Sequence, residues 1–253
     1  MTLKAISLSV ALGGKTVLND ISASFETGRV TAILGPNGAG KTSLMRAMLG
    51  LCTPVSGSVE LDGLPLAEID RQVLARRLGY LPQETSTVWN LQVRDMVALG
   101  RLPHRASFGH AIADDQAIAQ ALSDTKTAAL ADRPINALSG GERARVHFAR
   151  LLAGEPDWIL ADEPLANLDP PYQRDMLALL RASARQGKGV AVILHGLNAA
   201  ARVADDIVLM ANGTIVAAGS KQDVLNEANL AQTYGMDFRI HDIEGQTVIK
   251  PRD

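Results

Sequence analysis

A glycine-rich stretch constrains the fold of this chain more than any other segment. It reads Gly35-Pro36-Asn37-Gly38-Ala39-Gly40-Lys41-Thr42 and fits the pattern G-x-x-x-x-G-K-[ST]. Residues 30–34 before it are apolar or small, as in a buried strand. Residues 43–49 after it have apolar side chains at helical spacing, and Gly50 is placed to end that helix. Strand, glycine loop and helix in this order predict a phosphate-binding loop.

The chemistry of such a loop depends on its backbone and on two side chains. Glycines allow backbone N–H groups to turn toward an anion, and the following helix adds the partial positive charge of its N-terminus. Lys41 can reach the β- and γ-phosphates of a nucleotide, and the Thr42 hydroxyl can bind Mg²⁺. We therefore expect all residues of the loop, together with Ser43, to contact a nucleotide. A glycine-rich turn without a ligand would match the loop alone, but not its flanks.

Composition excludes several classes of protein. The chain has 253 residues, is 47% hydrophobic and has a formal net charge of −2, which gives no general argument for binding nucleic acid. One cysteine, Cys52, excludes an internal disulfide framework and fits a reducing compartment. No apolar run approaches the roughly 18 residues that span a bilayer. The apolar residues after Lys4 alternate with small or polar ones, as in a half-buried strand and unlike a signal peptide.

Strand patterns occur at both ends of the chain. Residues 3–10 and 17–25 form a predicted strand pair with its turn at Gly13-Gly14, and residues 58–63 a further short strand. Later strands are expected at 158–161 and 189–194, followed by a hairpin turning at Asn212-Gly213 and a terminal hairpin turning at Glu244-Gly245.

Helices alternate with the strands and dominate the middle of the chain. They are expected at residues 72–78, 93–99, 115–130 and 172–185. This order predicts an α/β fold of the P-loop NTPase type, with a mostly parallel central sheet, an N-terminal antiparallel β subdomain and an inserted α-helical subdomain. We expect one domain over residues 1–253, with a core of residues 1–83 and 154–253 and a helical subdomain of residues 84–153.

Two carboxylates follow the apolar strand at residues 158–161. In a P-loop NTPase an acid at the end of a neighbouring strand holds the Mg²⁺ shell, because this ion prefers hard oxygen ligands and keeps several waters. Asp162 fits that task, and Glu163 lies one residue beyond, where it can polarise the attacking water. Alone, such a pair indicates a solvated strand end. Downstream of a phosphate loop, the metal interpretation is favoured.

The segment Leu138-Ser139-Gly140-Gly141-Glu142 begins a further helix. Ser139 and Glu142 have the spacing of a capping box, and apolar residues mark one face of the following helix. A capped helix start preceded by glycines can bind an anion. It is equally the start of a well-capped surface helix, and local physics does not choose between the two.

This segment resembles the signature motif of ATP-binding-cassette (ABC) ATPases, and the resemblance extends over nearly the whole chain. The other motifs follow in that family's order: phosphate loop, Gln83 after a strand, signature, Asp162-Glu163, Asn167-Leu168-Asp169, and His195 after an apolar strand. The signature is the specific part, because many NTPases share a phosphate loop.

The resemblance implies an ATPase that binds ATP and Mg²⁺ between two copies of the chain paired head to tail. Residues Ser139, Gly140, Gly141 and Glu142 of one copy would close over the ATP of the other, with Ser139 and Gly141 at its γ-phosphate. Gln83 would join the Mg²⁺ and water shell and relay to a membrane partner. Residues Asn167 to Asp169 would run along the dimer seam, and His195 would hold the γ-phosphate and the water near Glu163.

A narrower resemblance rests on residues 93–104, His195-Gly196-Leu197-Asn198 and residues 217–219. These segments are similar to the ATPase subunits of importers for iron–siderophore complexes, haem and cobalamin. This implies two integral membrane permease subunits and, indirectly, a periplasmic or extracellular substrate-binding protein as partners, without nucleic acid. The chain would then be a peripheral protein on the cytoplasmic face of the inner (plasma) membrane.

Two positions depart from the family pattern. Leu12 stands where an aromatic residue usually stacks on adenine, so it can press on the base but lacks a π-face worth about 1 kcal/mol. Gly196 stands where an acid usually follows the histidine.

The alternatives to an importer subunit are a soluble ABC-type ATPase acting in cofactor assembly or nucleic-acid maintenance, and a regulatory nucleotide-binding module without turnover. The chain has no heptad stretch for coiled-coil arms, and its intact Lys41, Asp162, Glu163 and His195 argue against a module without turnover.

Overall fold

The computed structural model describes residues 1–83, 90–104 and 111–252, without the side chains of 111–113. The chain forms two compact units, Met1–Ile69 with Leu180–Asp253, and Asp70–Leu179. The predicted start of the helical subdomain at residue 84 lies outside the described residues. The predicted limits of core and helical subdomain therefore remain a prediction.

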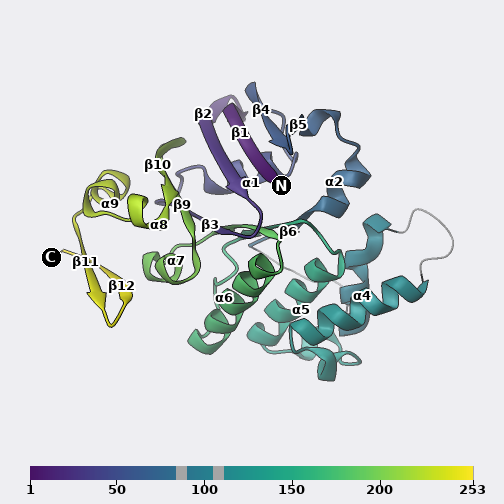
Figure 1. Cartoon of the computed structure of the whole chain (residues 1–253). Coiled ribbons are helices and arrows are strands. Elements are labelled where there is room, and N and C mark those ends of the chain that lie inside the picture. The colour runs from purple at the N-terminus through teal and green to yellow at the C-terminus, as the bar shows by residue number, and fades with distance from the viewer. Residues whose placement is uncertain (84–89, 105–110, 253) are drawn as a thin grey trace. The chain divides into compact units, whose positions relative to one another are not determined.

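An antiparallel sheet occupies the N-terminal part of the first unit (Figure 1). Its strand order is β2-β1-β4-β5, with bounds β1 Thr2–Leu12, β2 Lys15–Glu26, β4 Ser56–Leu61 and β5 Leu64–Pro65. Leu3, Leu8 and Val10 of β1 are fully buried. Gly13 and Gly14 have φ of 56° and 80°, the left-handed conformation that a tight hairpin turn requires. The predicted antiparallel β subdomain is thus confirmed.

The first unit also contains four strands in the order β10-β9-β3-β8. β3 pairs in parallel with β8 and β9, and β10 pairs with β9 antiparallel. Their bounds are β3 Val30–Leu34, β8 Gly189–Ile193, β9 Asp206–Ala211 and β10 Thr214–Ser220. Every residue of β3 and β8 is buried, as expected of apolar strands in a parallel sheet. Asn212 and Gly213 have φ of 50° and 75°, which confirms the predicted hairpin turn.

Short helices and a terminal hairpin complete this unit. They are η1 Leu66–Glu68, α1 Lys41–Met48, α7 Leu197–Val203, α8 Lys221–Val224, α9 Glu227–Tyr234, β11 Phe238–Ile243 and β12 Gln246–Pro251. Helix α1 begins two residues before the predicted start. It ends at Met48, and Gly50, the residue predicted to stop it, follows with a φ of 68°. Gly50 N–H donates to Ala47 O, and Leu51 N–H donates to Arg46 O, both at 2.9 Å.

The second unit combines a parallel strand pair with helices. β6 Leu78–Leu81 pairs with β7 Trp158–Asp162, from Leu78 opposite Trp158 to Leu81 opposite Ala161. Its helices are α2 Arg71–Arg77, α3 Val93–Ala98, η2 Leu99–His104, α4 Ala111–Asp124, η3 Ala128–Leu130, η4 Ile135–Ala137 and α5 Gly140–Ala153, and α6 Pro170–Arg185 runs on into the first unit. Helices α3, α4 and α5 share an apolar core that includes Val97, Leu122, Ile135 and Val146.

The predicted bounds of α4 and α6 are wrong, and a local cause explains the end of α4 and the start of α6. The helix predicted over residues 115–130 is α4, which begins earlier, at Ala111, and ends earlier, at Asp124. Lys126 is left-handed (φ 56°), and the Thr125 hydroxyl donates to Ala121 O at 2.8 Å. Helix α6 begins at Pro170, two residues before the predicted start. Proline suits the first turn of a helix, where its missing N–H costs nothing. None of the helices in the described parts of the chain is long and apolar enough to cross a bilayer.

A buried ion network connects η2 with the helices of the second unit. Arg101 is 5% exposed, and its Nε donates to Asp114 Oδ1 at 2.7 Å. Its Nη1 donates to Glu155 Oε2 at 2.6 Å and to Ala153 O at 2.9 Å. The neighbouring Gly100 allows η2 to approach α5, since a Cβ there would lie 2.0 Å from Arg150 O.

We predict that Arg101→Ala lowers the free energy of unfolding by about 3–5 kcal/mol, because it leaves the buried Asp114 carboxylate without its guanidinium partner. Denaturant unfolding measures this loss. The control is Arg71→Ala, since Arg71 is exposed on α2 of the same unit and a surface substitution changes stability by about 0.5 kcal/mol or less. Equal losses in the two variants would contradict the structural role of the network.

Candidate functional site

The glycine loop is held by segments that are distant in sequence. Gly35 and Gly40 have φ of 152° and 97°. A Cβ on Gly35 would lie 2.1 Å from Met210 O, and one on Gly40 would lie 2.9 Å from Val17 O. The Gly213 N–H donates to Ala39 O at 3.1 Å, so the β9–β10 turn holds the loop directly. No other residue type fits these two positions without moving the backbone.

The side chain of Lys41 lies within the curve of this loop. Lys41 is 6% exposed, and its Nζ donates to Gly35 O at 2.9 Å and to Pro36 O at 3.0 Å. Helix α1 begins at Lys41, and its N-cap Gly40 provides no capping side chain. The exposed Thr42 lies in the same first turn. A cationic side chain and an uncapped helix N-terminus together form a site for an anion.

Two further predicted site residues belong to the same unit. Strands β3 and β8 are parallel, and Leu194 N–H donates to Ile33 O at 3.3 Å. His195 therefore leaves the sheet at the edge where the glycine loop begins, and its side chain is exposed. Leu12 ends β1 and is 49% exposed, on the hairpin whose second strand packs against Gly40.

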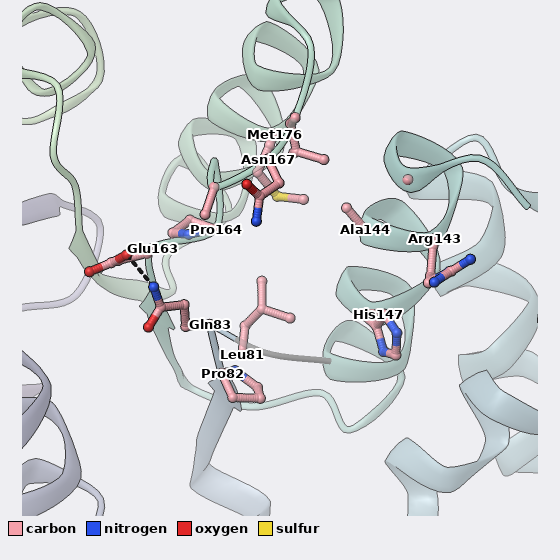
Figure 2. Close-up of a pocket in the computed structure, with 13 residues that line it drawn as sticks. Leu81, Pro82, Gln83, Arg143, Ala144, His147, Glu163, Pro164, Asn167 and Met176 are labelled. Carbon is pink, nitrogen blue, oxygen red and sulfur yellow. Dashed lines mark hydrogen bonds between the residues drawn. The ribbon is translucent and has the colours of Figure 1, made fainter. Parts of the chain in front are cut away.

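The acidic pair and Gln83 lie together in the second unit, because the parallel strands β6 and β7 end at the same edge. Asp162 is the buried last residue of β7. Glu163 is left-handed (φ 50°), a conformation that is rare for residues with a side chain and gathers at functional sites. Gln83 Nε2 donates to Glu163 Oε2 at 2.5 Å (Figure 2). This bond orients the carboxylate.

The loop after Glu163 is held by a residue that sequence reasoning missed. Gln173 on α6 donates from Nε2 to Leu168 O at 2.9 Å, and its N–H donates to Asp169 O at 3.0 Å. Asn167 in this loop is also left-handed, with a φ of 59°. The signal for Gln173 in the sequence is a long amide side chain in the first turn of the helix that follows Asp169.

The signature segment forms the predicted capping box at the start of α5. Glu142 N–H donates to Ser139 Oγ at 3.3 Å, and Ser139 N–H donates to Glu142 Oε2 at 2.9 Å. Hydrogen bonding with the backbone of Ser139, and then with its side chain, lowers the pKa of the Glu142 carboxyl. Ser139 and Gly140 are exposed, whereas Gly141 is buried under Tyr172, whose ring would lie 2.2 Å from a Cβ at Gly141.

A cavity of about 390 Å³ lies within the second unit. Gln83, Glu163 and Asn167 line it together with Arg143 and His147 of α5, as Figure 2 shows. His147 is 2% exposed, and neither ring nitrogen has a hydrogen-bond partner among the described residues. Burial, with the charges of Arg150 and Arg143, lowers the pKa of His147 to about 4, so the ring is neutral at pH 7.

The lowered pKa of His147 predicts that the folded protein loses stability in acid. Between pH about 6.5, the pKa of an unfolded histidine, and pH about 4, the unfolded chain binds a proton that the folded chain does not. The free energy of unfolding therefore falls by up to about 3 kcal/mol as the pH falls through this window. His147→Leu should remove that part of the pH dependence, measured by denaturant unfolding at several pH values. The exposed His241 on β11 gives the control, His241→Leu; equal slopes for both variants would contradict the assignment.

Comparisons with known proteins found similar sequences and similar structures. The profile of the ABC transporter family matches residues 18–166. The hemin import ATP-binding protein HmuV of Rhodococcus jostii (strain RHA1) is 40% identical over 100% of this chain and 87% of its own length. HmuV of Burkholderia cenocepacia (strain HI2424) is 44% identical over 94% of this chain and 95% of its own.

Solved structures share the fold. A chain from a transporter described as a metal-chelate type ABC transporter in an inward-facing conformation superposes with a TM-score of 0.86. It is 26% identical, and the match covers 100% of this chain and 97% of that one. The predicted fold class is thereby confirmed: a mixed α/β fold with a mostly parallel sheet, an antiparallel β subdomain and helices, shared with ABC ATPases.

Proposed function

Because this chain belongs to the ABC transporter family, as one of its ATP-binding chains, we propose that it hydrolyses ATP to drive haem import through a membrane permease. The observation that carries the choice of haem is the similarity, over the whole chain, to proteins named for hemin import. The iron–siderophore and cobalamin cargoes expected from the sequence are the neighbouring candidates.

The phosphate loop supplies the binding of ATP. Residues Gly35 to Ser43 would surround the phosphates, with Lys41 neutralising the charge of the β- and γ-phosphates. Lys41 Nζ donates to Gly35 O and Pro36 O, so two carbonyls of the loop hold its ammonium in place. This suits phosphoryl transfer, which depends on positioning and charge neutralisation more than on covalent help. Leu12 would press on the adenine.

The predicted Mg²⁺ ligands fit a metal held mainly by phosphates. Among the described residues, no three His, Cys, Asp or Glu side chains gather as a metal cluster. The predicted set is instead one carboxylate, one hydroxyl and one amide oxygen, from Asp162, Thr42 and Gln83. Such hard oxygen donors, few in number, suit an ion that keeps waters and substrate phosphates as its other ligands. When bound, Mg²⁺ would neutralise charge on the transferring phosphoryl group.

Glu163 is the proposed base, and Gln83 orients it. The hydrogen bond from Gln83 Nε2 orients the carboxylate of Glu163, whose backbone is left-handed. His195 would hold the γ-phosphate and the attacking water. In a head-to-tail pair, the exposed Ser139 and Gly140, with Gly141, Glu142 and Asp169, would meet the ATP of the second copy.

This mechanism places the chain in a larger assembly. The partners are a second copy, two integral membrane permease subunits and, indirectly, a periplasmic or extracellular substrate-binding protein. The location is the cytoplasmic face of the inner membrane. Loss of γ-phosphate contacts after hydrolysis would loosen the pair of ATPase chains, and Gln83 would relay this change to the permease.

Growth on haem tests the cargo. Cells lacking the chain should fail to grow with haem as the sole iron source but grow normally with a ferric salt, and the wild-type chain should restore growth. The tagged chain should co-purify from membranes with integral permease subunits. Undiminished growth on haem would overturn the cargo, and a chain without a membrane partner would favour a soluble ATPase.

Glu163→Gln tests the catalytic assignment, because the amide keeps the shape of the side chain and loses its basicity. We predict that ATP turnover falls by at least about 100-fold while ATP still binds, so that an ATP-bound dimer accumulates in size-exclusion chromatography.

Lys41→Ala is the complementary variant, and equilibrium binding should show lost affinity for ATP. Wild-type turnover in the first variant, or wild-type affinity in the second, would contradict the role of that residue.

A further inference from the structure

Asn198 connects the segment after His195 with the C-terminal hairpin. It is the second residue of α7, and both polar atoms of its side chain bind one residue of β12. Asn198 Nδ2 donates to Ile249 O at 3.2 Å, and Ile249 N–H donates to Asn198 Oδ1 at 2.8 Å. Figure 1 shows α7 and the yellow hairpin of β11 and β12 in the first unit, where α7 contacts β12.

These two bonds fix orientation as well as distance. A side-chain amide has the same donor and acceptor as a peptide group, so Asn198 binds Ile249 as a neighbouring antiparallel strand would. Ile249 is 4% exposed and lies opposite Ile240 in the hairpin. The exposed Asn198 is therefore anchored to Ile249, a residue that is packed in the hairpin.

His195 lies in a short connection between two anchored ends. On one side, Leu194 N–H binds Ile33 O within the parallel sheet, and on the other, Ala200 N–H binds Gly196 O in the first turn of α7. The backbone of His195 therefore lies between a residue bound to the sheet and the first turn of α7, and both ends of this short connection constrain it.

We propose that Asn198 is a positioning residue for His195, and that the hairpin β11–β12 is the support against which it acts. This inference rests on the proposed function, in which His195 contacts the γ-phosphate. Asn198 holds the first turn of α7 at a fixed place on β12, and because α7 begins two residues after His195, this turn helps to set the orientation of the His195 backbone. The hairpin thereby becomes part of the ATPase machinery, although it contributes no residue to the nucleotide site.

Asn198→Ala removes both bonds and tests this role. We expect kcat for ATP hydrolysis to fall about tenfold, because small displacements of a catalytic group lower the rate steeply. KM for ATP should stay within about twofold of wild type, since the phosphate loop supplies the binding. Asn198→Asp keeps the acceptor for Ile249 N–H and loses the donor, so its kcat should lie between those of wild type and Asn198→Ala.

The control is Asn229→Ala in α9 of the same unit. Asn229 Nδ2 also donates to a backbone carbonyl, Val224 O at 3.0 Å, but in a segment that does not adjoin His195. Its loss should leave kcat and KM unchanged. Comparable losses of folding stability in the Asn198 and Asn229 variants would show that altered turnover comes from position and not from unfolding.

A double variant separates positioning from general support. If Asn198 acts through His195, then His195→Ala with Asn198→Ala should be no slower than His195→Ala alone. Additive losses, or unchanged kcat in Asn198→Ala beside a slow His195→Ala, would overturn this inference and leave the proposed function standing. Wild-type kcat in His195→Ala would overturn this inference and the catalytic role of His195, while haem import would still be tested by growth on haem.

Discussion

The close approach of the glycine loop to its neighbours is the constraint on which the nucleotide site depends. Gly35 lies so near Met210 O, and Gly40 so near Val17 O, that a side chain at either place would collide with backbone. The bond from Gly213 N–H to Ala39 O adds a third anchor from the β9–β10 turn. A loop held by backbone from β2 and β9 keeps its shape before ATP arrives. The ordering of its amide groups is then achieved during folding and does not reduce the affinity for ATP.

Features with a local physical cause could be predicted from the sequence. The turns at Gly13-Gly14, Asn212-Gly213 and Glu244-Gly245 all have positive φ. Glycine and asparagine adopt this conformation at little cost, and each of the three turns contains a glycine. The capping box of Ser139 and Glu142 depends on residues three apart in one helix. Buried parallel strands are continuous apolar runs whatever their neighbours. Such patterns suffice for the fold class and for the order of the site motifs.

Features that depend on contacts between distant segments could not be predicted in this way. Nothing near Arg101 in sequence shows that its partners are Asp114 and Glu155, and nothing near Asn198 points to Ile249. The burial of His147 depends on the packing of α5 in the second unit. Helix α4 ends early because Lys126 adopts a left-handed conformation that helical periodicity alone does not reveal. Residues that belong to the site without being part of a sequence motif are held there by contacts with segments that are distant in sequence.

A common principle joins three of the site residues. A side chain that must face a ligand cannot be packed on every side, so the backbone or another polar group has to hold it. Two loop carbonyls hold Lys41, Gln83 and a strained backbone hold Glu163, and the connection between β8 and α7 holds His195. Hydrogen bonds suit this task because they fix direction, which apolar contacts do not. In the proposed mechanism, turnover therefore depends on Gln83 and Asn198 as well as on the residues that would touch ATP.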